Sequence, residues 1–176
     1  EINLVASMKL FFERLFPKSS EKFIHIPSSI DTKVVYPSKS YSSPTIAYIG
    51  SLVQNRGLEI LPYIIKESVK IDKSYRFFII GSGPLENWLR FKIKDIGYEK
   101  NIKIIGNVEF DKLSNVCGGC WIGLSLYPTQ SIYPVDILKT LVYMSLGMPI
   151  ISYINIEEAK DVSIKTNFSP NSYANA

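Results

Sequence analysis

The fold of this protein follows from the segment TIAYIGSLVQNRGLEILPYIIKESVKIDKSYRFFIIG, residues 45–81. It begins with the apolar run TIAYI and ends with the apolar run RFFII, and a glycine directly follows each run. Between the two runs, apolar residues recur at helical spacing. Continuous apolar strands that alternate with helices are typical of a parallel sheet covered on both faces. The segment therefore predicts a β-α-β unit.

The same alternation continues toward the C-terminus. In chain order, we expect a helix at 85–97, a strand at 102–106, a short helix at 111–116, a strand at 121–127, a helix from about 135 to 146 and a strand at 149–152. The predicted fold class is α/β, with a Rossmann-like parallel sheet and helices on both of its faces. The tail after Ile156 is polar, and we expect it to be irregular.

The N-terminal part has a different pattern. Apolar residues at helical spacing predict one amphipathic helix over residues 4–16, and the segment KFIHIP predicts a strand over residues 22–27. A polar segment rich in Pro and Ser follows, as in the connectors that separate domains. We therefore expect residues 31–44 to be a linker between residues 1–30 and a main domain at 45–176.

Composition and charge disfavour several classes of protein. With 176 residues, 46% of them hydrophobic and 20% charged, the chain can form a globular domain with a real core. The net charge is +4, but the basic residues are scattered, so nucleic acid is not an expected partner. The longest uncharged run, residues 113–135, contains several Gly and Pro residues and fits a strand between turns better than a membrane span. No signal peptide is visible at Glu1.

Two cysteines, Cys117 and Cys120, form the motif CGGC. A redox pair of this spacing is expected to open a helix after a strand, whereas here the strand-like segment WIGLSLY follows the motif. A structural zinc site needs four ligands, and the sole histidine, His25, is distant in sequence. We expect two half-buried thiols near a turn, and no metal.

In open parallel sheets, ligands bind beyond the carboxyl ends of the strands, so the residues just after each strand are candidates for a site. After the first strand come Gly50 and Ser51, and Arg56 lies where the next helix opens. The second strand is followed by GSGP, in which a third fingerprint glycine is missing because Glu86 occupies its place, and this disfavours a nicotinamide dehydrogenase. The third strand is followed by Gly106, Asn107 and Val108. Each glycine alone fits a tight turn, but jointly they outline a rim that suits a phosphate.

The segment YPVDILKTLVYMSLGMPIIS, residues 133–152, contains two isolated charges in an apolar region, Asp136 and Lys139. Burying an ion costs several kcal/mol unless something compensates, so these side chains either face a cleft or meet partners. In one interpretation, both face a ligand. In the other, Asp136 lies in the first turn of a helix and Lys139 extends outward to solvent.

The order of these signals resembles the C-terminal, nucleotide-sugar-binding domain of GT-B glycosyltransferases, specifically the group 1 family (family 4, retaining). The resemblance covers residues from about 22 to 153 and depends on five segments in series. These are IPSSIDTKVVYP, AYIGSLVQNRGLEIL, FFIIGSGPLENWL, IKIIGNVEFDKL and LKTLVYMSLGMPIIS. The helix at 4–16 resembles the last helix of the family's N-terminal domain. On this view most of that domain lies outside the chain, and the donor-binding domain at 45–176 is truncated.

The resemblance also implies residue roles. Arg56 stands where a basic residue contacts the donor diphosphate beside the turn at Gly50, and Lys139 matches another basic position of the family. The backbone of Val108 would read the base. Pro134 and Val142 stand where the family has two glutamates, so the resemblance implies weaker binding of the donor. The resemblance assigns donor binding to Gly50, Ser51, Arg56, Gly81, Ser82, Gly83, Asn107, Val108, Tyr133, Pro134, Val135, Asp136, Lys139 and Val142.

The leading hypothesis is therefore a hexosyltransferase, mannosyl- or glucosyl-, that uses a UDP- or GDP-hexose as substrate and needs no cofactor. Arg56 and Lys139 would stabilise the leaving diphosphate, and the absent N-terminal domain would bind most of a glycan or lipid-linked acceptor, so the chain alone is expected to be inactive. The family default is a cytoplasmic enzyme, with peripheral association at the inner face of the membrane as a variant. One alternative is a catalytically impaired relative with a binding or regulatory role. Another is a flavodoxin-like or Rossmann-like module for a different nucleotide.

Overall fold

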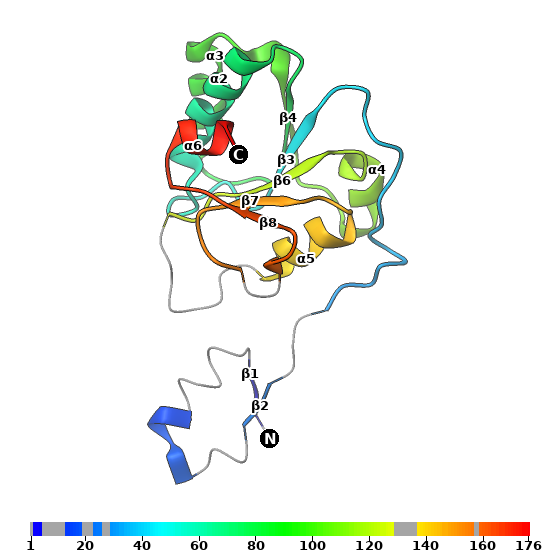
Figure 1. The fold of residues 1–176 in the computed structure, drawn as a ribbon, viewed down its shortest axis with the longest axis vertical. Coiled ribbons are helices and arrows are strands. Elements are labelled where there is room, and N and C mark those ends of the chain that lie inside the picture. Colours follow the sequence, from blue (N-terminus) through cyan, green and yellow to red (C-terminus); the bar gives the residue numbers. More distant parts are fainter. Residues whose placement is uncertain (1, 5–12, 19–22, 26–28, 129–136, 157–158) are drawn as a thin grey trace.

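The computed structural model describes residues 2–4, 13–18, 23–25, 29–128, 137–156 and 159–176 (Figure 1). Its strands are β1 (Ile2–Leu4), β2 (Phe23–His25), β3 (Thr45–Ile49), β4 (Arg76–Ile80), β5 (Ile102–Gly106), β6 (Ile122–Ser125), β7 (Ile150–Ser152) and β8 (Ser163–Lys165). Its α-helices are α2 (Leu61–Ile71), α3 (Glu86–Ile96), α4 (Leu113–Cys117), α5 (Ile137–Ser145) and α6 (Pro170–Ala174). Short 3-10 turns are η2 (Leu58–Ile60), η3 (Glu99–Asn101) and η4 (Phe110–Lys112).

Strands β3 to β8 form one parallel sheet of six strands in the order β5-β4-β3-β6-β7-β8. The chain builds outward from β3 to β5, returns to the middle, and then builds outward on the other side from β6 to β8. The direction of building reverses between β3 and β6, and such a reversal point is where a crevice opens at the carboxyl edge of a doubly wound sheet. The predicted α/β fold class is confirmed.

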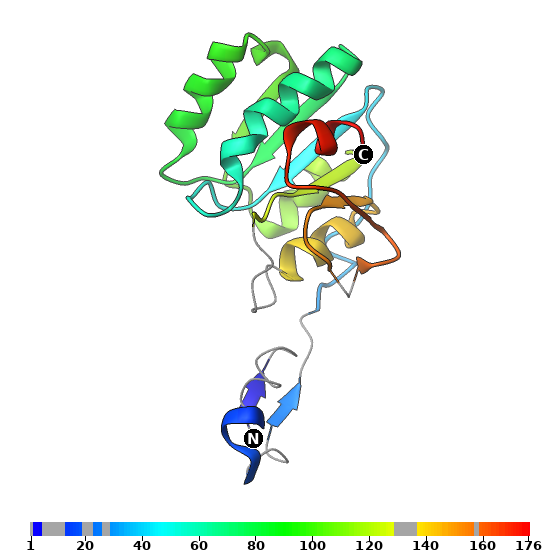
Figure 2. The same cartoon turned by 60° about the vertical axis from the view of Figure 1, so that its left-hand side comes forward.

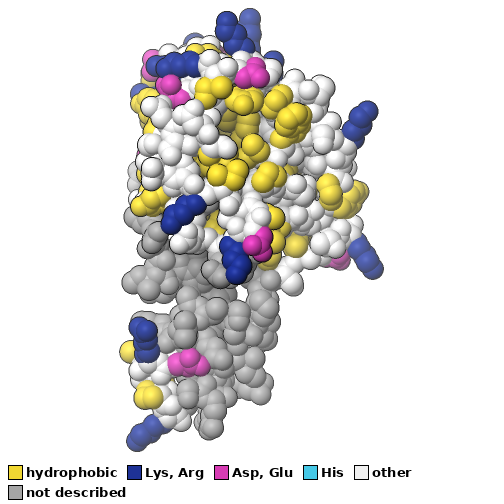
Figure 3. All heavy atoms as spheres, in the orientation of Figure 1, with side chains coloured by type: hydrophobic (Ala, Val, Ile, Leu, Met, Phe, Trp, Pro, Cys, Tyr) yellow, Lys and Arg dark blue, Asp and Glu magenta, His cyan; other side chains and the backbone are white. Residues whose placement is uncertain are grey.

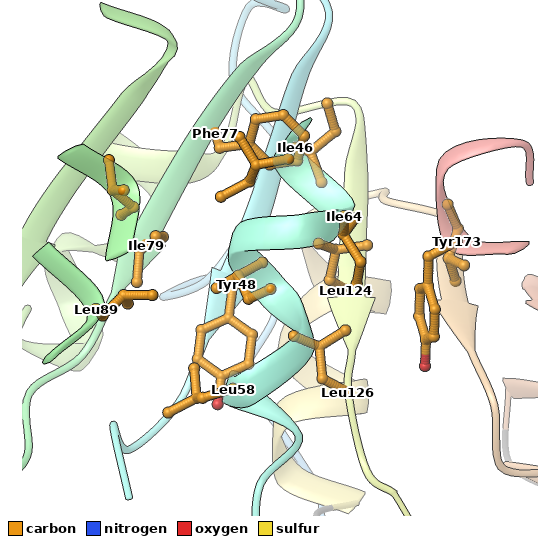
Figure 4. Packing of buried hydrophobic residues seen from close by; sticks show 14 of the residues in the cluster. Ile46, Tyr48, Leu58, Ile64, Phe77, Ile79, Leu89, Leu124, Leu126 and Tyr173 are labelled. Carbon is orange, nitrogen blue, oxygen red and sulfur yellow. The ribbon is translucent and has the colours of Figure 1, made fainter. Parts of the chain in front are cut away.

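Helices cover both faces of this sheet, as Figures 1 and 2 show, with α2 and α3 on one side and α4 and α5 on the other. Successive residues of a strand point to opposite faces, so Ile46 and Tyr48 pack into the core beneath α2 while Ala47 packs into the core beneath α5. Figure 4 shows the first core, where Ile64 of α2 and Leu89 of α3 meet the sheet. Both faces of the central strands are therefore buried, which explains their continuous apolar sequences.

The C-terminal tail is an ordered part of this domain, so the prediction that it is irregular was wrong. β8 pairs in parallel with β7, and α6 packs against α2. Tyr173 of α6 is buried, its hydroxyl donates a hydrogen bond to the Ser125 carbonyl at 2.8 Å, and the same oxygen accepts one from the Tyr153 N–H at 3.0 Å. One aromatic side chain thus anchors the polar tail, and a contact with so distant a part of the chain leaves no periodic signal.

The N-terminal residues form a separate two-stranded parallel sheet from β1 and β2. The predicted strand at 22–27 is confirmed over Phe23–His25. The predicted helix at 4–16 was wrong at its start, because Leu4 ends β1. Residues 13–15 are helical, and residues 5–12 lie outside the described part.

The expected linker, residues 31–44, lies against α4 and the turn that follows it. Val35 is fully buried, the Ser38 N–H donates a hydrogen bond to the Gly118 carbonyl at 2.9 Å, and the Tyr41 N–H donates one to the Gly119 carbonyl at 2.9 Å. A Cβ added at Gly119 would lie 2.5 Å from the Lys39 carbonyl oxygen. The two glycines of CGGC therefore allow this segment to approach the domain closely.

Candidate functional site

Two adjoining pockets open at the carboxyl ends of β3 and β4, where the topology places the crevice. The β4-side pocket has a volume of about 260 Å³ and the α5-side pocket about 250 Å³. They form one cleft, because both are lined by Ile49, Gly50, Ser51, Phe110 and Leu113. The β4-side pocket adds Ile80, Gly81, Ser82, Asn107 and Val108, and the α5-side pocket adds Tyr48, Arg56, Leu138, Lys139 and Val142.

Lys139 of α5 points into this cleft and is only 7% exposed. Its Nζ lies 4.9 Å from the centroid of the Tyr48 ring and 5.0 Å from that of the Tyr127 ring. A Cβ added at Gly50, whose φ is +151°, would lie 3.3 Å from the Lys139 Nζ. The interpretation in which Lys139 extends outward was wrong, because two aromatic faces attract the ammonium group into the crevice.

Arg56 reaches the same place from the loop after β3. Its Cζ lies 5.1 Å from the centroid of the Tyr127 ring, and its guanidinium donates a hydrogen bond to the Tyr127 hydroxyl. Asn55 and Gly57, on either side of Arg56, have φ of 62° and 73°. A Cβ at Gly57 would lie 1.5 Å from the Leu126 carbonyl oxygen, so only glycine lets this loop lie against the end of β6.

The other predicted residues fall into three groups. Gly81, Ser82, Asn107 and Val108 meet in the β4-side pocket as expected. Gly83 lines neither pocket and instead packs on the preceding loop, because a Cβ there would lie 2.4 Å from the Leu52 carbonyl oxygen. Outside the described residues lie Tyr133, Pro134, Val135 and Asp136.

Sequence reasoning missed the aromatic side chains of the cleft. The Tyr127 ring contacts both cations, the Tyr48 ring contacts Lys139, and Phe110 is 43% exposed between the two pockets. Tyr48 and Tyr127 lie in apolar segments whose pattern predicts only a buried strand. Their position at the carboxyl ends of the neighbouring strands β3 and β6 is a signal that could have identified them.

The CGGC motif lies away from this cleft and is structural. Both thiols are free and buried, and burial raises the pKa of Cys117 and of Cys120 to about 12. They are more deeply buried than the half-buried thiols we expected. Within the described ranges, no group of three His, Cys, Asp or Glu side chains could hold a metal ion.

A third pocket, of about 210 Å³, lies at the opposite, amino end of the sheet. It is lined by aromatic and aliphatic side chains, among them Tyr75, Phe77, Trp121 and Tyr173. Figure 3 shows apolar side chains gathered on the face that carries α6. This pocket lacks the paired cations and glycine turns of the cleft, so the cleft is the candidate site.

A doubly wound parallel sheet with a cationic cleft at its reversal point defines a class of domain suited to a phosphorylated ligand. The family model for "Glycosyl transferases group 1" matches residues 43–171, so the chain belongs to the group 1 glycosyltransferases. This membership confirms the resemblance to the group 1 glycosyltransferases that the five segments indicated. No curated protein sequence matches the chain.

Solved structures share the fold at low sequence identity. TarM of S. aureus, a mutant in complex with fondaparinux, alpha-GlcNAc-glycerol and UDP, is 17% identical with a TM-score of 0.75 over 98% of this chain and 35% of its own. The pneumococcal O-GlcNAc transferase GtfA, in complex with UDP and GlcNAc, is 17% identical with a TM-score of 0.73 over 98% of this chain and 36% of its own. The C-terminal domain of LpcC, a group 1 family protein from Francisella tularensis, is 16% identical with a TM-score of 0.61 over 84% of this chain and 85% of its own.

The chain thus spans about a third of the length of TarM and GtfA. Among the residues that the structure describes, no helix is long and apolar enough to cross a membrane.

Proposed function

We propose that this domain binds the nucleotide diphosphate sugar donor of a retaining, family 4 glycosyltransferase, with a UDP- or GDP-hexose as the ligand. The observation that carries the proposal is the meeting of Arg56 and Lys139 on one tyrosine ring beside the Gly50 turn. The donor diphosphate would lie in the α5-side pocket and the nucleoside in the β4-side pocket, near the backbone of Val108. In support, TarM and GtfA share this fold and were solved with UDP.

Electrostatics gives the proposed role its physical basis. One cation 4 Å from one phosphate charge contributes on the order of 4 kcal/mol at an effective dielectric near 20, before desolvation. Lys139 is already buried, so much of the desolvation that its charge requires has occurred on folding. Two cations held in place also stabilise the charge that develops on a leaving diphosphate. Arg56 and Lys139 would thereby favour transfer of the sugar without a metal or a cofactor.

A second candidate function is a binding or regulatory role for a catalytically impaired domain. Val142 favours it, because this buried valine lines the α5-side pocket where the family resemblance leads us to expect a glutamate. Valine cannot accept hydrogen bonds from a ribose. Charge-assisted hydrogen bonds contribute about 1.5 to 3 kcal/mol, so their loss would weaken donor binding by roughly ten- to a hundred-fold.

We further propose that residues 1–30 belong to the end of an N-terminal domain and a linker strand, and that this other domain binds most of the acceptor. On this proposal the domain alone binds donor without turning it over. A cytoplasmic location, with peripheral association at the membrane, is part of the same proposal.

Ligand-observed NMR with UDP, GDP and their hexose conjugates tests the proposal, and we expect one base to be preferred. Arg56→Ala should strongly weaken the signal. Lys103→Ala is the matched control, because the Lys103 Nζ also lies over an aromatic ring, 5.7 Å from the centroid of Phe78, but outside the cleft. No binding by the folded protein would favour the second candidate, and tight binding of a flavin or dinucleotide would point to a different nucleotide.

A further inference from the structure

Tyr127 contacts both cations of the cleft. Its ring centroid lies 5.1 Å from the Arg56 Cζ and 5.0 Å from the Lys139 Nζ, and its hydroxyl accepts a hydrogen bond from Arg56. Tyr127 itself is only 6% exposed and lies two residues beyond the end of β6, at the reversal point of the sheet. A rigid side chain therefore joins a cation of the β3 loop to a cation of α5.

Electrostatic repulsion and side-chain entropy both disfavour this close arrangement of the two cations. Like charges repel, and the long stems of arginine and lysine have many rotamers, so holding both groups at one place costs free energy. A ring face attracts a cation without neutralising it, and the attraction grows when the site is desolvated. Tyr48, which is 1% exposed, presents a second ring to Lys139 at 4.9 Å. The phenol oxygen of Tyr127 additionally orients the Arg56 guanidinium.

We infer that Tyr127 is a positioning residue that assembles Arg56 and Lys139 into a single anion site before the ligand arrives. The inference rests on the proposed function, since it takes the anion to be the donor diphosphate. Preorganisation of this kind raises affinity by removing the ordering cost from the binding step. The two cations should therefore act as a unit, and removal of the Tyr127 ring should weaken diphosphate binding although the ring carries no charge.

The first test needs no ligand. The Lys139 Nζ lies 4.9 and 5.0 Å from two ring centroids, so ring currents should shift the NMR signals of the neighbouring ε-methylene protons upfield. Tyr127→Phe should retain this shift, and Tyr127→Leu should reduce it. The signal of Lys103, over Phe78, should stay unchanged in both variants. An unchanged Lys139 shift in folded Tyr127→Leu would overturn the inference.

The second test is calorimetric titration with inorganic pyrophosphate. We expect Tyr127→Leu to bind about tenfold more weakly than the wild type, and Tyr127→Phe about threefold more weakly. In the double variant of Arg56→Ala and Tyr127→Leu, the fold-loss in affinity should be smaller than the product of the fold-losses of the two single variants, because both changes disrupt the same unit. Tyr63→Leu, at an exposed position on α2, is the control for a tyrosine-to-leucine change elsewhere.

The outcomes separate the two proposals. If wild-type protein binds neither pyrophosphate nor any nucleotide, the proposed function and this inference are both overturned. If Arg56→Ala loses binding while Tyr127→Leu keeps full affinity, the inference alone is overturned. Should Tyr127→Leu fail to fold, Tyr127→Phe decides. In Tyr127→Phe, a roughly threefold loss of pyrophosphate affinity with a retained Lys139 chemical shift supports the inference, and wild-type affinity overturns it.

Discussion

Tyr143→Phe should destabilise the domain through two hydrogen bonds at the point where β3 and β6 separate. Their ladder pairs Ile46 with Ile122 and Ala47 with Gly123 and goes no further. Beyond it the Tyr143 hydroxyl of α5 accepts a hydrogen bond from the Ile49 N–H at 2.9 Å and donates one to the Leu124 carbonyl at 2.9 Å. The hydroxyl thus links the two strands beyond the end of their backbone ladder.

The magnitude follows from burial. Tyr143 is 0% exposed, and removal of its hydroxyl leaves the partly buried Ile49 N–H and the buried Leu124 carbonyl without this partner. An unsatisfied buried polar group costs about 1 to 3 kcal/mol, and we expect a total loss of about 2 kcal/mol in the free energy of unfolding. For a domain of this size, the melting temperature should fall by roughly 4 to 8 °C.

Urea unfolding and calorimetry of Tyr143→Phe, beside the wild type, measure both quantities. Tyr63→Phe is the matched control, because Tyr63 is 45% exposed on α2 and its change should stay within about 0.5 kcal/mol. If Tyr143→Phe is as stable as Tyr63→Phe, the Tyr143 hydroxyl does not stabilise the junction between β3 and β6, and the reasoning is refuted.

Three further predictions concern glycines and thiols. Gly57→Ala should lower the free energy of unfolding in urea by about 2 to 5 kcal/mol, because its Cβ would meet Leu126. Gly97→Ala is the control, because Gly97 has a similar φ of 75° but nothing within 4 Å of the added Cβ, and it should cost only about 1 to 2 kcal/mol. Equal losses in the two variants would refute the steric argument. Cys117 and Cys120, whose pKa values burial raises to about 12, should resist maleimide at pH 7.5 until urea unfolds the protein, and labelling of the native state at the unfolded rate would contradict their burial. Thiols in the unfolded chain have a pKa near 8.5, so above that pH they ionise in the unfolded state before they ionise in the folded state. Their contribution to stability is therefore complete below about pH 8.5 and declines as the pH rises toward 12. Urea unfolding at several pH values would measure this decline.

Some features of the candidate site could be predicted because they lie at fixed places relative to the strands. Gly50 and Gly81 each follow a strand directly, and parallel strands end at the same edge of a sheet, so their meeting needs no knowledge of side-chain packing. The role of Gly83 could not be predicted in this way. Its backbone packs on Leu52, and only the path of the loop after β3 creates that contact.

The sequence by itself determined the parallel α/β architecture, because apolar periodicity and turn signals are local properties of the chain, and its five ordered segments carried the resemblance to the family. Only the tertiary structure decided where the charges and the polar tail lie. Lys139 is buried because Tyr48 of β3 and Tyr127 beyond β6 converge on it, and the tail is ordered because Tyr173 bridges β6 and the end of β7. Each of these contacts joins residues that are distant in sequence, so its free energy depends on how the sheet brings its strands together, and no local pattern records it.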